Sequence, residues 1–170
     1  MEPRDLLVEA FTRIQQHVHR AVADLAPEDL GYRADPDANS IAWLIWHLSR
    51  VQDDHVSELA GIEQRWTAAG WFDRFHLPFD ERATGYGQSR DEVARLGDLT
   101  ADLLTGYFDE VHEATLAFVR SITADQLDRV VDRRWDPPVT MGVRLVSVID
   151  DDIQHAGQAM FVRGLVERRG

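Results

Sequence analysis

Four long segments of the chain place apolar side chains at steps of three and four residues, the spacing of one face of an α-helix. These segments cover residues 3–25, 41–61, 101–122 and 141–168. No segment alternates with a period of two for long enough to demand a sheet. The pattern predicts an all-α four-helix bundle, built as one domain of residues 1–170.

Hydroxyl side chains mark where three of these helices begin. Ser40, Thr100 and Thr140 each precede a helical segment, and their oxygens can accept a hydrogen bond from a free backbone N–H of the first turn. The long irregular connection between the second and third helices, residues 62–98, holds glycine, proline, aromatic residues and a capping box that begins at Ser89. We expect a folded packing loop there, and its length favours a crossover over strict up-down-up-down order.

Composition excludes several classes of function. The chain has no cysteine, so it forms no disulfide, thiolate metal site or cysteine nucleophile, and any thiol chemistry must use a thiol from outside. The net charge of -12 and the scattered arginines argue against nucleic-acid binding. Residues 1–20 carry charges throughout and lack the apolar core of a signal peptide, and no stretch has the length of a membrane span. The expected compartment is the cytoplasm.

The last helical segment carries the sharpest chemical signal. Asp151 and His155 are four residues apart, so on a helix they share one face and both can reach one cation. Asp150 and Asp152 point about 100° to either side and are poorly placed to do the same. An aspartate and a histidine at this spacing more often form a surface pair, which is the competing interpretation.

An apolar stripe opposite this pair weakens the surface interpretation. A helix with buried character on both sides is central or lies at a subunit interface. The stripe also suggests a homodimer formed through it. Its residues are Ile149, Ile153, Ala156 and Met160.

His47 in the second segment is the candidate for a third ligand. A histidine among apolar neighbours such as Trp43 and Val51 is usually a core residue. Bundle cores, however, also build metal sites from side chains on facing helices. His55 competes with His47, but the two lie about 12 Å apart along a helix, so both cannot bind one ion.

Two stretches give the sequence a family resemblance. NSIAWLIWHLSRVQ and, near the C-terminus, DDDIQHAGQAMFVRG resemble the DinB-like superfamily of bacterial four-helix proteins. The chain is most similar to the branch that contains mycothiol-dependent S-transferases and maleylpyruvate isomerase. The resemblance implies His47, Asp151 and His155 as ligands of one divalent metal ion. Many members have histidine or glutamate at the position of Asp151, and the shorter aspartate implies a closer or weaker metal site.

The same resemblance implies a reaction. Three protein ligands leave an open position on the metal, where a low-molecular-weight thiol such as mycothiol would bind as the thiolate. Zinc suits these ligand types best, and nickel, iron and manganese are the alternatives. The expected activity is transfer of the thiol to an electrophilic small molecule, as in detoxification. Two alternatives stay open: a maleylpyruvate-type isomerase, and a metal-binding stress protein without turnover.

Four aromatic residues are candidates to line the substrate pocket, although each is as readily explained by packing of the core or loop. They are Trp43, Trp71, Tyr107 and Trp135.

Overall fold

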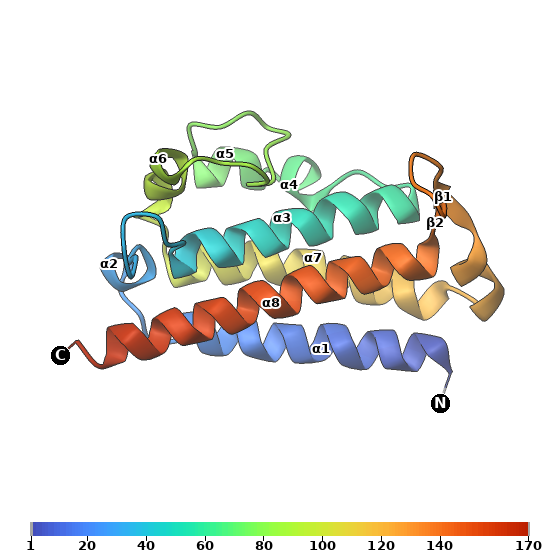
Figure 1. Ribbon diagram of the computed structural model, residues 1–170, viewed down its shortest axis with the longest axis horizontal. Coiled ribbons are helices and arrows are strands. Elements are labelled where there is room, and N and C mark those ends of the chain that lie inside the picture. Colours follow the sequence, from blue (N-terminus) through green and yellow to red (C-terminus); the bar gives the residue numbers. More distant parts are fainter. Residues whose placement is uncertain (1, 170) are drawn as a thin grey trace.

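The computed structural model describes residues 2–169, and its long helices are those that the sequence predicts. They lie side by side along the long axis of the molecule, in the neighbour order α1–α8–α3–α7 (Figure 1). The prediction of an all-α four-helix bundle is confirmed. The four helices are α1 (Pro3–Val22), α3 (Ile41–Ala60), α7 (Ala101–Ser121) and α8 (Met141–Glu167).

The predicted helix starts are correct. The hydroxyls of Ser40, Thr100 and Thr140 each accept a hydrogen bond from the backbone N–H three residues on, at 3.1, 3.2 and 3.3 Å. Helix α3 ends where Gly61 adopts the left-handed conformation, with φ 69°. Helix α1 ends earlier than predicted, because Asp24 also takes a left-handed conformation, with φ 59°.

The predicted crossover is present. Helices α1 and α8 run in one direction, and α3 and α7 run in the other (Figure 1). Arg163 near the end of α8 donates to the carbonyl of Arg20 near the end of α1, at 2.8 Å. In the opposite pair, the amide of Gln52 donates to the hydroxyl of Thr115, at 2.8 Å. The connection from α3 to α7 therefore returns along the whole bundle before the next helix starts.

That connection is folded, and it lies against α3 (Figure 1). Its capping box at Ser89 is present, with the hydroxyl and the Glu92 carboxylate each accepting from the other's backbone N–H. Its helices are α4 (Arg65–Ala68), α5 (Trp71–Phe75), α6 (Arg90–Val93) and the 3₁₀ turn η1 (Ala94–Leu96).

Two buried charges of α3 hold the connection in place. The fully buried Arg50 donates from Nε to the carbonyl of Ala83, at 3.1 Å. Asp53 accepts from the backbone N–H of Trp66 at 2.8 Å and from the hydroxyl of Tyr107 at 2.9 Å. Because such groups are costly to leave unpaired inside a protein, the bonds to Ala83 and Trp66 fix the connection at a defined height along α3.

The remaining elements close the ends of the bundle (Figure 1). They are α2 (Pro27–Leu30), η2 (Ala124–Asp128), β1 (Val130–Asp132) and β2 (Val139–Thr140). Strands β1 and β2 pair antiparallel in a hairpin that the sequence pattern was too short to reveal. In the part of the chain described, no helix combines the length and apolar character needed to cross a bilayer.

The apolar stripe predicted on the last helix lies mostly against the core, as expected for a central helix, and does not form one exposed surface. Ala156 is 1% exposed in the core, and Ile149 and Met160 are half-buried against it. Only Ile153, at 48%, faces outward. Helix α8 packs against both α1 and α3, so the core covers more of its circumference than one stripe. The homodimer stays a prediction.

Buried His112 of α7 predicts a pH dependence of stability. Its ring stacks on Phe108, is 3% exposed and has no hydrogen bond at Nδ1. Burial lowers the pKa of His112 below its ordinary 6.5. Below about pH 6.5 the unfolded chain therefore binds a proton that the folded chain refuses, so stability falls as the pH falls through the folded pKa.

Replacement of His112 by leucine is expected to reduce this loss. Between pH 7.5 and 5.0 the wild-type free energy of unfolding should fall by up to about 1 kcal/mol more than that of the variant. Urea denaturation in EDTA at both pH values measures it. The lowered pKa values of His47 and His55 act in the same direction and the raised pKa of His155 acts oppositely, but all three are present in both proteins. Equal losses in the two proteins would contradict the assignment to His112.

Candidate metal centre

Helix α3 presents His47 at the middle of the bundle. The histidine is 5% exposed, and the indole of Trp43 stacks on its ring one turn earlier, with centroids 4.6 Å apart and planes at 17°. This stacking packs one face of the imidazole against the indole, and the His47 ring lies next to the His155 ring of α8.

Helix α8 presents Asp151 and His155 opposite. Their spacing of four residues places them one above the other, with Nε2 of His155 3.5 Å from Oδ1 of Asp151. The His155 ring meets the His47 ring edge-on, at a centroid distance of 4.8 Å. The structure thus brings together the three residues singled out from the sequence. One donor atom of each lies within 4.8 Å of the other two.

The donor atoms of this triad that are not engaged by other residues suit a cation. Nδ1 of His47 donates to the carbonyl of Thr84 at 2.5 Å, and Nδ1 of His155 lies 3.2 Å from Oε1 of Gln158. Both contacts leave Nε2 of the ring for a metal, the usual arrangement around a ligating histidine. Oδ2 of Asp151 is buried and has no hydrogen-bond partner. Two imidazole nitrogens and one carboxylate oxygen suit a three-ligand divalent site with an open position.

The pKa values of the two histidines shift in opposite directions. Burial lowers the pKa of His47, and the nearby His155 adds to this effect. Burial also acts to lower the pKa of His155, but the hydrogen bond and negative charge of Asp151 outweigh it, so the net shift is upward. As the pH falls, His155 therefore takes up a proton before His47 does. A cation must displace that proton, so its affinity should fall as the pH falls.

A strap of residues 83–88 covers the outer side of His47. Besides the bond from His47 to Thr84, Nε1 of Trp43 donates to Oε1 of Gln88 at 2.7 Å. Gly85 lies between Thr84 and Gln88 in the chain and packs directly against the rings of His47 and Trp43. Its φ is 97°. None of these strap residues was predicted from the sequence to take part in the site. The two close glycines of Gly85-Tyr86-Gly87 were the available signal, because they mark a turn with positive φ.

His55, the competing histidine, lies outside the triad. Its Nδ1 accepts from Arg144 of α8 at 2.9 Å, and Arg144 also donates to Asp132 at 3.2 Å. Among residues 2–169, the triad is the one group of three histidine, aspartate or glutamate side chains close enough together to share an ion.

The aromatic candidates divide between site and core. Trp43 lies at the triad. Trp71 and Tyr107 are buried in the core, and Trp135 is 65% exposed in the β1–β2 hairpin. The prediction that these three line the pocket finds no support in their positions.

Asp152 follows the triad aspartate but faces the bundle interior. It is fully buried, and neither of its carboxylate oxygens has a hydrogen-bond partner among the described residues. Burial, and then the charge of Asp151, raise the pKa of Asp152 well above its usual range.

Replacement of Asp152 by alanine is therefore expected to stabilise the metal-free protein by about 1–3 kcal/mol, because it removes a buried carboxyl without a partner. Asp150→Ala on the exposed side is the control and should change the free energy of unfolding by no more than about 0.5 kcal/mol. Urea denaturation at pH 7 in EDTA compares them. A clear loss of stability in Asp152→Ala would mean that this carboxyl makes a stabilising contact.

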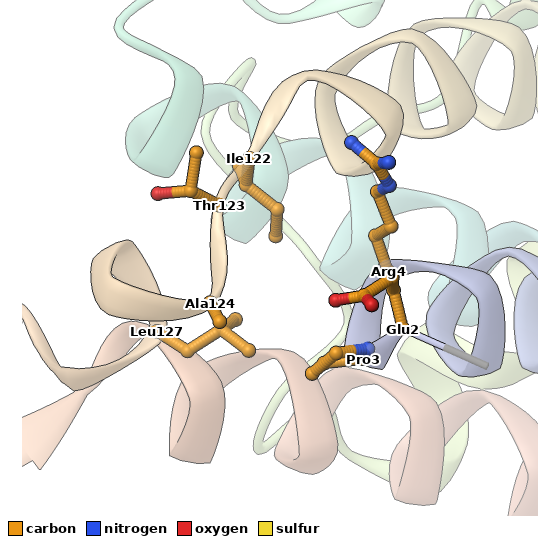
Figure 2. Close-up of a pocket in the computed structure, with 7 residues that line it drawn as sticks. All are labelled: Glu2, Pro3, Arg4, Ile122, Thr123, Ala124 and Leu127. Atoms are coloured by element: carbon orange, nitrogen blue, oxygen red, sulfur yellow. The ribbon is translucent and has the colours of Figure 1, made fainter.

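A pocket of about 190 Å³ lies elsewhere, where α1 begins and α7 passes into η2 (Figure 2). It shares no residue with the triad or the strap, so it does not serve the metal centre. Its lining residues are Glu2, Pro3, Arg4, Ile122, Thr123, Ala124 and Leu127.

Comparisons with known proteins agree with this architecture. The model of the mycothiol-S-transferase family matches residues 6–168. A solved structure described as the conserved protein of a locus from Enterococcus faecalis superimposes with a TM-score of 0.91 at 30% identity. That alignment covers 98% of each chain. No curated protein gives a significant match.

Proposed function

The chain belongs to the mycothiol S-transferase family, and we propose that it is a divalent-metal-dependent transferase that joins mycothiol to an electrophilic small molecule. The observation that carries this proposal is the triad: three donor atoms within 4.8 Å, with the other nitrogen of each imidazole engaged elsewhere. Detoxification of reactive compounds in the cytoplasm is the role that we assign to the reaction.

His47, Asp151 and His155 would hold the ion, and zinc is the metal that we propose, with nickel, iron or manganese as alternatives. A bound divalent cation would lower the pKa of a thiol at its open position, which provides a thiolate near neutral pH. A divalent cation held by two neutral imidazoles and one carboxylate would leave the site with a net positive charge. That charge would favour an anionic sulfur over a neutral one.

The surrounding residues keep this geometry. Thr84 and Gln158 orient the two imidazoles, and the indole of Trp43 shields one face of His47 from water. In the transfer step the thiol sulfur forms a bond to the electrophilic carbon, and the leaving group departs with its bonding electron pair. The thiol proton passes to solvent.

The test uses the zinc-loaded protein with mycothiol and iodoacetamide. We expect the thioether, detected by mass spectrometry, to form faster than in the protein-free mixture. His155→Ala should remove at least about 99% of this increase, since it removes a ligand that the reaction needs. Mycothiol bound without any increase in rate would favour the non-catalytic binding protein. Conversion of maleylpyruvate with return of free mycothiol would favour the isomerase.

A further inference from the structure

A pocket of about 570 Å³ opens between the loop that precedes α3 and the C-terminal half of α8. Its inner wall includes Leu44 and Val162, which are 1% and 6% exposed, and Phe161 stands at its rim with 66% of its surface exposed. Gly157 forms part of the wall, where an added Cβ would meet no atom within 4 Å. The pocket is therefore an apolar recess with free space above a helix backbone.

This pocket adjoins the metal centre. Gln158 lines it, and the same side chain lies 3.2 Å from Nδ1 of His155. On the facing helix, Leu44 in the wall directly follows Trp43, which stacks on His47. A ligand in the pocket would thus lie next to Gln158, the residue that contacts the Nδ1 edge of His155.

The chemistry of the lining selects against anions. Asp35 is the one charged residue among those described around the pocket, and the other polar groups are neutral amides. The chain as a whole carries a net charge of -12. A carboxylate placed here would find no cationic partner and would be repelled, whereas an aromatic or alkyl group would cover the exposed ring of Phe161.

We propose that this pocket binds the uncharged, apolar body of the electrophile and turns its reactive carbon toward the triad. The inference rests on the proposed transferase function and adds the substrate class: neutral electrophiles with an aromatic or alkyl group. The sulfur–carbon bond forms at that carbon, and the leaving group departs with its electron pair.

Three electrophiles with the same iodomethyl carbonyl group provide the test: iodoacetamide, its N-benzyl derivative and iodoacetate. With zinc-loaded protein and mycothiol, the N-benzyl compound should have a kcat/KM at least about tenfold above that of iodoacetamide, a modest gain for burial of an aromatic ring. Iodoacetate should be the slowest of the three once the protein-free rates are subtracted. Equal values for the N-benzyl compound and iodoacetamide would overturn the proposal.

Gly157→Phe fills the pocket, because its ring would project into the open space above the helix. It should lower the preference for the N-benzyl compound by at least about fivefold. Val146→Phe is the matched control, since Val146 is 62% exposed on α8 outside the pocket. If both variants changed the preference equally, the pocket would not be the binding site.

A binding measurement separates this proposal from the proposed function. Titration with unreactive N-benzylacetamide, followed by amide NMR, should shift Phe161 and Val162 saturably in the wild type but not in Gly157→Phe. Such shifts without turnover of any electrophile would support binding in the pocket and contradict the proposed transferase function. Turnover without these shifts would support the transferase and overturn the pocket.

Discussion

His155→Ala is expected to abolish tight binding of a divalent cation, with zinc affinity weakened by more than about 100-fold. Loss of a group that merely orients a ligand already costs about 10–100-fold, and loss of the ligand itself should cost more. His47→Ala should have an effect of the same order, because each imidazole supplies one of only three donors. The measurement is metal content by mass spectrometry, with competition titration for the affinity.

Two aspartates provide the internal control. Asp151→Ala should weaken zinc binding, because Oδ2 is buried without a partner and Oδ1 lies 3.5 Å from His155. Asp150→Ala should bind zinc as the wild type does, since Asp150 is exposed and accepts instead from Gln154, at 2.8 Å. Equal behaviour of the two variants would show that the assignment of helix faces is wrong. Stoichiometric metal in His155→Ala would remove the proposed site altogether.

Local signals made most of the fold predictable. The caps at Ser40, Thr100 and Thr140 each involve a hydrogen bond from a backbone N–H only three residues further along the chain. The sequence alone therefore predicts these helix starts correctly. The spacing of Asp151 and His155 is equally local, since a helix places residues four apart on one face. That this helix face meets His47 could not be predicted from local spacing, because it depends on how the helices pack in the bundle. The family resemblance indicated that His47 joins Asp151 and His155.

Contacts between segments far apart in the sequence could not be predicted from these local signals. Nothing local marks Thr84 as the acceptor for His47, because the bond depends on how Arg50 and Asp53 anchor the whole connection. For a related reason, the sequence could not show which residues of the apolar stripe on α8 are buried. A helix that packs against two neighbours buries a wide arc, so Ala156 turned inward while Ile153 of the same stripe stayed outside.

The strap is the feature that joins the fold to the chemistry. Trp43, His47 and Arg50, spaced along the same side of α3, each bond to the strap, at Gln88, Thr84 and Ala83. The buried charges that order the connection therefore also set the orientation of a metal ligand. This coupling predicts that metal affinity is sensitive to a residue that carries no ligand atom.

Gly85→Ala is expected to weaken zinc binding by about 10–100-fold, the usual cost of disturbing a group that orients a ligand. A Cβ at Gly85 would lie 2.7 Å from Nδ1 of His47 and 3.0 Å from the ring of Trp46, so the strap or the imidazole must move. The bond from His47 to the Thr84 carbonyl would then be lost or displaced. The positive φ of 97° adds a backbone cost of about 1–3 kcal/mol to folding.

Gly87→Ala separates these two effects. Gly87 also has a positive φ, 73°, but a Cβ there would meet nothing within 4 Å. It should therefore lose stability through backbone strain while binding zinc almost as the wild type does. Competition titration gives the affinities, and the ¹⁵N shifts of the His47 ring in the metal-free protein report whether Nδ1 still carries the proton. Equal loss of affinity in both variants would assign the effect to strain in the strap. Wild-type affinity in Gly85→Ala would show that the strap does not hold His47.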